Sequence, residues 1–259
     1  MKNLAEYTDR AIDLLEDGGY KEVTDLLMPI WQQFPDNDEI LLLLAEGLFG
    51  QNNSKQAFKL LEQRVQRPDY DPELLFLLGD EYFANDRCDD AITCYTKLNN
   101  IPECQAEALV RIGMVYLFRG ELAPAKDIFA QALEHDSTSL SAFNSLGDIS
   151  MELGNKTEAK KWYQRAIDAN EDDPEAWGNL AELHYDDGDL SDARKCALKA
   201  IACDKEYASA WLTLGYVALD DDEEVLACQN FKEFLALEDG VGAEDIVVEV
   251  KAVLTALQS

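Results

Sequence analysis

Residues 174–184 read PEAWGNLAELH, and the same arrangement of residue types returns at 208–218 as ASAWLTLGYVA. In both stretches a tryptophan is followed three residues later by a leucine, and then at once by a small residue. The two tryptophans, Trp177 and Trp211, are separated by 34 residues. A fixed period of this length is typical of repeat proteins, in which one supersecondary unit is stacked many times.

The same period covers almost the whole chain. Seven ungapped units of 34 residues begin at residues 4, 38, 72, 106, 140, 174 and 208. Position 20 of each unit is alanine, except for Val23 in the first, and position 4 is large and apolar throughout. Position 7 is apolar except for Arg10. Position 8 is small in every unit: Ala11, Ala45, Gly79, Gly113, Gly147, Ala181 and Gly215.

These columns predict two helices in each unit. Positions 4, 7, 8 and 11 share one face of a helix, and positions 20, 24 and 27 share a face of a second. The small residues at 8 and 20 let the two helices pack closely, so we expect Trp177 and Trp211 to be core residues beside them. Pro29 lies inside the second helix of the first unit and should kink or shorten it. The expected turns are often marked by Gly or Asn: Gly18, Asn52, Gly120, Gly154 and Gly188.

This pattern resembles the tetratricopeptide repeat, whose signature is a W-x-x-L-G/A-x-x-Y run with Ala at 20, an aromatic residue at 24 and Ala at 27. The match covers residues 4–241, and the fourth to sixth units fit best. The resemblance implies an all-α, right-handed superhelical solenoid of seven helix–turn–helix units, forming one domain over residues 1–259.

Residues 243–258, AEDIVVEVKAVLTALQ, leave the repeat pattern. Ile246, Val250, Val253 and Leu257 are at helical spacing behind an acidic first turn, which favours a helix. We expect it to cap the last unit, since a solenoid otherwise exposes the face meant for the next repeat. A helix that mediates self-association is the alternative.

Composition narrows the range of partners and locations. The chain has 52 acidic and 22 basic residues, a formal charge of −30, which opposes binding to nucleic acid or directly to anionic membranes. The N-terminus lacks the apolar core of a signal peptide, and no apolar run is long enough to span a bilayer. Six cysteines without C-x-x-C spacing favour reduced thiols, so we expect a cytoplasmic protein.

Function is predicted to depend on a groove. By resemblance, positions 2, 5, 6, 9, 12 and 13 of the first helices line a concave surface. Carboxylates and aromatic rings recur there, which favours a basic protein or peptide segment with long aliphatic stems. The candidate contact residues are Glu46, Phe49, Phe76, Asp80, Phe83, Arg111, Phe118, Asn144, Asp148, Asn179, Glu182, Tyr185 and Tyr216.

The alternative for this groove is a solvated acidic face, expected anywhere on so acidic a protein. Arg111 is the one cation at positions 2, 5, 6 and 9, so a clamp for a C-terminal carboxylate is disfavoured. No catalytic motif, metal spacing or cofactor motif is found, and His184 is expected to be a packed histidine at position 11.

Three functions stay open at this point. The first is a noncatalytic scaffold or adaptor that binds a basic segment. The second is a structural or self-assembling subunit that stacks through terminal repeats, using Trp31 and Phe34. The third is a chaperone or regulatory subunit of an enzyme or secretion system.

Overall fold

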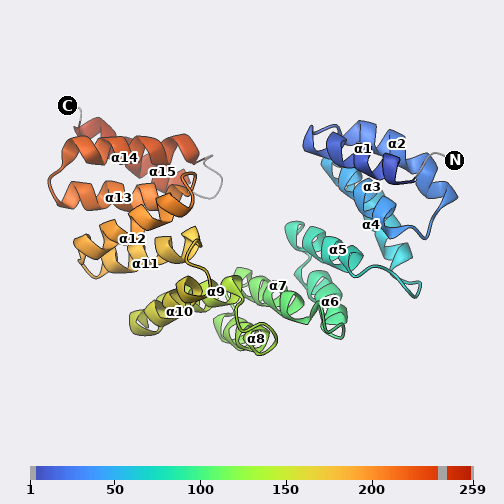
Figure 1. Cartoon of the computed structure of the whole chain (residues 1–259), viewed down its shortest axis with the longest axis horizontal. Helices are drawn as coiled ribbons and strands as arrows, with labels where there is room; N and C mark the ends of the chain where they lie inside the picture. The colour runs from blue at the N-terminus through green and yellow to red at the C-terminus, as the bar shows by residue number, and fades with distance from the viewer. Residues whose placement is uncertain (1–3, 239–243, 258–259) are drawn as a thin grey trace. The chain divides into compact units, whose positions relative to one another are not determined.

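The structure is a computed structural model in which residues 4–238 and 244–257 are described. These residues form fifteen α-helices and no strand (Figure 1). The predicted all-α class is therefore confirmed. By internal contacts the chain divides into two compact units, Met1–Ile128 and Phe129–Ser259, and each is described by itself. That the whole chain forms one domain stays a prediction.

Each 34-residue repeat forms a first and a second helix, as expected. The first helices are α1 (Leu4–Glu16), α3 (Asp38–Gly50), α5 (Glu73–Ala84), α7 (Gln105–Phe118), α9 (Leu140–Glu152), α11 (Pro174–Asp186) and α13 (Ala208–Asp220). The second helices are α2 (Tyr20–Gln33), α4 (Ser54–Arg64), α6 (Cys88–Leu98), α8 (Leu122–His135), α10 (Lys156–Ala169), α12 (Leu190–Cys203) and α14 (Glu224–Leu237). In the second compact unit, α11 packs on α12 and also contacts the neighbouring first helices α9 and α13.

The turn between the two helices is the same in all seven repeats. Position 15 has a positive φ in each, between 58° and 77°. Glycine adopts this left-handed conformation without strain, and Asn and Asp tolerate it better than other residues. The predicted turns are thus present, and Asp86 and Asp222 supply the two that the Gly and Asn pattern missed. The seven residues are Gly18, Asn52, Asp86, Gly120, Gly154, Gly188 and Asp222.

The small residue at position 8 accommodates the aromatic ring at position 24 of its own repeat. A Cβ atom on Gly147 would lie 2.2 Å from Cε1 of Tyr163, and one on Gly79 would lie 2.4 Å from Cε1 of Tyr95. The expectation that these small residues accommodate the opening tryptophans was therefore wrong. Trp177 and Trp211 are partly buried residues that pack against the core, and each donates its Nε1 hydrogen to a backbone carbonyl.

The expected capping helix is α15 (Glu244–Leu257), and residues 243 and 258 of the predicted range lie outside the described residues. Val250 and Leu254 are buried in one cluster with Phe231 and Phe234 of α14. Ile246, expected on the packing face, is 41% exposed. The buried face runs instead through Val247, one residue later.

Pro29 does not shorten its helix, which continues to Gln33. The amide of the Gln33 side chain donates to the carbonyl of Pro29 at 3.1 Å, an added bond in the turn that follows the proline.

Candidate binding groove

Charge is divided unequally between the two kinds of helix. The seven first helices contain 17 acidic and 2 basic residues, whereas the seven second helices contain 12 acidic and 14 basic residues. A chain with a random excess of acid would show the excess on both. The acidic residues are thus concentrated on the helices that the repeat pattern predicts to line the groove.

In the second compact unit, a recess of about 260 Å³ lies between the first helices α9 and α11. Tyr163 donates its hydroxyl hydrogen to Oδ1 of Asp148 at 2.7 Å, and Nδ2 of Asn179 donates to the same oxygen at 3.3 Å. No lysine or arginine is among the residues described as lining the recess. Those residues are Asp148, Met151, Glu152, Tyr163, Asn179 and Glu182.

Three carboxyl groups at or near this recess have raised pKa values. Burial raises the pKa of Asp148, and the Tyr163 hydrogen bond only partly opposes that change. Burial, followed by repulsion from Asp186 and Asp148, raises the pKa of Glu182. Burial likewise raises the pKa of Glu175, the position-2 residue of α11. Desolvation and like charges both disfavour ionised carboxylates, and a bound cation would relieve both.

The equivalent site in the first compact unit is different. Tyr95 donates its hydroxyl hydrogen to Oδ1 of Asp80 at 2.6 Å, as Tyr163 does to Asp148. Here the residue from the next repeat is Arg111, which forms ion pairs with Asp80 and with Glu107 and stacks over the ring of Phe76. This carboxylate therefore already has a cationic partner within the protein.

The predicted aromatic residues of the first compact unit, other than Phe76, form two ring contacts. Phe118 is 62% exposed and meets Phe83 edge to face, with ring centroids 5.2 Å apart. Phe49 packs on the edge of Phe58 of α4. These side chains all belong to the first compact unit, as does Glu46 on α3, where partial desolvation of the carboxyl raises its pKa.

Tyr185 and Tyr216 stack in the second compact unit, with centroids 6.0 Å apart. The hydroxyl of Tyr216 donates to Glu249 of α15 at 3.0 Å, so this ring is tied to the capping helix. The pKa of Tyr185 is raised to about 12. Burial is the largest cause, and a hydrogen bond to Asp220 is the next.

Two predicted contact residues do not reach the surface. Asn144 is 1% exposed, and its Nδ2 donates to Asp173 at the start of α11 at 3.1 Å. Phe76 is 6% exposed beneath Arg111. The pattern of positions could not distinguish an inward from an outward side chain at position 5. Met151 and Glu152 were missed, although they occupy groove positions 12 and 13 of their repeat.

Models of known repeat families match parts of the chain. A TPR repeat model matches residues 147–188, and two tetratricopeptide repeat models match residues 179–237 and 107–139. The chain is a tetratricopeptide repeat protein. A search of curated proteins gives no match.

Solved structures place this tetratricopeptide repeat protein among others of the same fold. A tetratricopeptide repeat protein from Parabacteroides merdae matches with a TM-score of 0.69, at 17% identity over 98% of each chain. A chain of the APC/C hetero-tetramer Cut9–Hcn1 matches with a TM-score of 0.67 at 15% identity, and the present chain spans half of its length. MamA matches with a TM-score of 0.52 at 24% identity, over 64% of this chain and 96% of that one. At these identities the likeness shows the fold alone.

In the described part of this tetratricopeptide repeat protein, His184, Asp189 and Asp192 form a histidine–carboxylate group, with ligand atoms within 4.8 Å of one another. Nδ1 of His184 lies 3.7 Å from a carboxylate oxygen of Asp189, and the ammonium of Lys160 lies 3.3 Å from the other ring nitrogen, Nε2. His184 is 8% exposed and is therefore the packed residue that its position predicted.

Among residues 4–238 and 244–257, no helix combines the length and the apolar character needed to span a bilayer.

Proposed function

We propose that this tetratricopeptide repeat protein is a noncatalytic scaffold that binds a basic segment of a partner protein along its first helices. The recess at Asp148, Asn179 and Glu182 carries the proposal, because its carboxylates have raised pKa values and its described lining includes no cation. Repeat solenoids present extended surfaces that suit such segments.

A lysine or arginine side chain fits the chemistry of this recess. Its aliphatic stem can lie along Met151, and its charged end can donate to Asp148 and Glu182. Charge-assisted hydrogen bonds of this kind contribute about 1.5–3 kcal/mol each. The excess of acid on the first helices would also accelerate encounter with a basic segment in a salt-dependent manner.

The test uses the full chain and a labelled peptide rich in Lys and Arg, with fluorescence anisotropy at low and moderate salt. We expect Asp148→Asn together with Glu182→Gln to weaken binding by at least about tenfold, equivalent to about one charge-assisted hydrogen bond. A matched control, Asp168→Asn together with Glu233→Gln, removes the same charge from exposed positions on second helices. It should bind like the unaltered protein. Equal loss in both variants would instead mean that only net charge acts.

The alternative function, self-assembly, has a readout of its own. Self-assembly through terminal repeats predicts a concentration-dependent mass in light scattering, whereas the scaffold proposal predicts a constant one. A cytoplasmic location belongs to the proposal because all six cysteines are free thiols, as is typical of a reducing compartment. Identification of the bound partner would distinguish a scaffold from a chaperone or from a regulatory subunit of an enzyme.

A further inference from the structure

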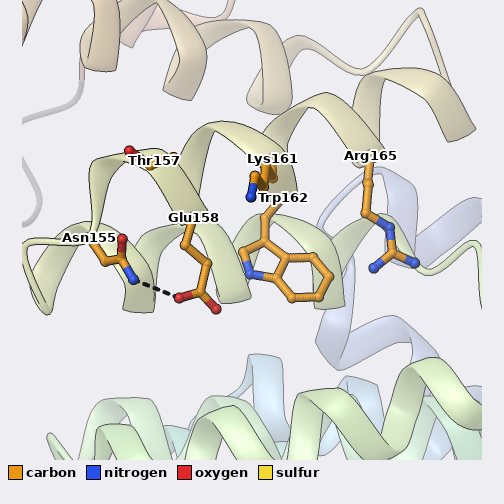
Figure 2. A pocket seen from close by; sticks show the side chains of 6 residues that line it. All are labelled: Asn155, Thr157, Glu158, Lys161, Trp162 and Arg165. Carbon is orange, nitrogen blue, oxygen red and sulfur yellow. Dashed lines mark hydrogen bonds between the residues drawn. The ribbon is translucent and has the colours of Figure 1, made fainter.

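The second helix α10 has a hollow surface of its own, distinct from the acidic recess. A cavity of about 460 Å³ is lined by residues of α10 and the turn before it. Figure 2 shows the side chains of Trp162 and Arg165 next to each other along this helix, with Glu158 one turn earlier. Asn155 donates to Glu158 at 2.8 Å, so this carboxylate has a local partner. The cavity is lined by Asn155, Thr157, Glu158, Lys161, Trp162 and Arg165.

Arg165 is stacked on two rings. Its guanidinium carbon lies 4.5 Å from the ring centroid of Phe143 and 4.9 Å from that of Trp162. The Nε1 hydrogen of Trp162 has no acceptor among the described residues, in contrast to Trp177 and Trp211, which donate to backbone carbonyls. Packing against the ring of Phe143 and the guanidinium of Arg165, rather than a hydrogen bond, therefore positions this indole on α10.

Other stacked arginines show what Arg165 lacks. Arg87 stacks over Tyr82 at 4.1 Å and donates to Asp90 at 2.8 Å. Arg111 stacks over Phe76 and forms ion pairs with two carboxylates. Within residues 4–238 and 244–257, Arg165 has no such carboxylate and makes no described hydrogen bond. A stacked guanidinium still presents its planar fork of N–H donors, which matches a carboxylate.

Lys161 adds a second cation to the same surface. It is exposed, and in the described part of the chain it forms no ion pair. The remaining lysines of α10 have contacts, since Lys156 pairs with Asp187 at 2.9 Å and Lys160 contacts His184. Lys161 and Arg165 are four residues apart, and therefore neighbours on one side of the helix.

We propose that the α10 surface of Lys161, Trp162 and Arg165 is a second docking site, which binds an acidic segment of a partner protein. One carboxylate of the segment would pair with the stacked guanidinium of Arg165 and another with Lys161, while an apolar side chain enters the hollow beside Trp162. Charge complementarity selects this partner. A nucleic acid would need many more cations than Lys161 and Arg165 supply, since its affinity depends on the number of phosphates that the protein neutralises.

The experiment measures anisotropy of a fluorescein-labelled dodecapeptide that contains four glutamates and a central phenylalanine, mixed with the full-length protein. A peptide with glutamine at the four glutamate positions is the ligand control. We expect Lys161→Glu together with Arg165→Glu to reduce the affinity at least about tenfold, because two charge-assisted pairs become repulsive. Lys161→Glu alone, which leaves the stacked arginine in place, should give a smaller reduction and serves if the double variant fails to fold.

Lys199→Glu together with Lys232→Glu is the matched charge control on exposed positions of α12 and α14, and it should retain the affinity of the unaltered protein. The groove variant Asp148→Asn with Glu182→Gln should also retain it, so failure of the groove proposal leaves this one standing. Binding that is equal for the glutamate and glutamine peptides would overturn the proposal. Tighter binding of a labelled oligonucleotide, or self-association lost specifically in the α10 variant, would also overturn it, in favour of nucleic acid or a second copy.

Discussion

Asp80 in the third repeat and Asp148 in the fifth occupy position 9 of their repeats, and their surroundings differ in one decisive residue. Each accepts a hydrogen bond from the tyrosine at position 24 of its own repeat, at 2.6 Å and 2.7 Å. Each also meets the residue 31 positions later, at position 6 of the next repeat. For Asp80 this residue is Arg111, and for Asp148 it is Asn179.

The difference teaches that the repeat geometry and the charge of the groove are set by different positions. The tyrosine and the small residue under it are shared, so both repeats pack alike. Position 6 of the following repeat decides whether the carboxylate meets a cation, as Asp80 meets Arg111, or a neutral amide, as Asp148 meets Asn179. A single substitution should therefore convert one site into the other.

The largest expected effect concerns the shared packing. Gly79→Leu and Gly147→Leu both place side-chain atoms where Tyr95 and Tyr163 lie, since even a Cβ would come within 2.4 Å and 2.2 Å of their rings. We expect each to lower the free energy of unfolding by about 1–3 kcal/mol or more through overpacking. Thermal and urea melts measure it, and an unchanged melt for either variant would contradict the packing described for position 8.

The next effect is the exchange of the position-6 residues. Asn179→Arg should supply Asp148 with an internal cation and weaken binding of a basic peptide by about tenfold, the size of one charge-assisted pair. Arg111→Asn should have the opposite effect at Asp80 and strengthen binding. Anisotropy titrations with the same peptide test both. If the two variants changed affinity in the same direction, position 6 would not control the charge of the groove.

A smaller effect should distinguish the two tyrosines. Tyr163→Phe removes the hydroxyl donor from a carboxylate whose other described protein donor is an amide, whereas Tyr95→Phe leaves Asp80 paired with Arg111. We expect a loss of about 1 kcal/mol for Tyr163→Phe and less for Tyr95→Phe. Paired urea denaturation curves provide the comparison, and the reverse order would argue against it.

The smallest effect is a dependence on pH. The pKa values of Asp148, Glu175 and Glu182 are raised in the folded chain, so between their unfolded and folded values the folded state binds more protons. This contribution destabilises at neutral pH and is relieved as pH falls through the folded pKa values. We expect Asp148→Asn with Glu182→Gln to stabilise the protein most near pH 7 and progressively less on acidification. Basic peptides should bind the unaltered protein less tightly over the same range. Melts and titrations across pH check both, and a stability gain independent of pH would exclude the carboxylates as its source.

Much of this fold could be predicted because its period is visible in single columns of residue types. Position 8 is small in every repeat, and a fixed period needs no knowledge of long-range contacts. The orientation of individual side chains could not be predicted in this way. Trp177 is half-buried and donates to a backbone carbonyl, and Asn144 is buried and donates to Asp173, neither of which the repeat pattern indicates.

The candidate site was predictable in character and not in detail. Position 9 was expected to be acidic, but the neutralisation of Asp80 depends on a residue 31 positions away that contacts it only once the repeats stack. Among the described residues no carboxylate pairs with Arg165, and the sequence does not indicate this, because acidic residues are abundant in the chain and only the fold determines which of them are near.

In the fifth and sixth repeats the first helices, α9 and α11, carry a net negative charge, whereas the second helices, α10 and α12, carry a net positive charge, so each of these two helix pairs is electrically polar from its first helix to its second. Within a screening length of about 8–10 Å, the field of the α9 and α11 face differs from that of the α10 face. These fields would orient an approaching protein that carries both positive and negative surface regions before the two proteins are in contact. Orientation, and not only attraction, is thus encoded by which helix of the pair carries the carboxylates.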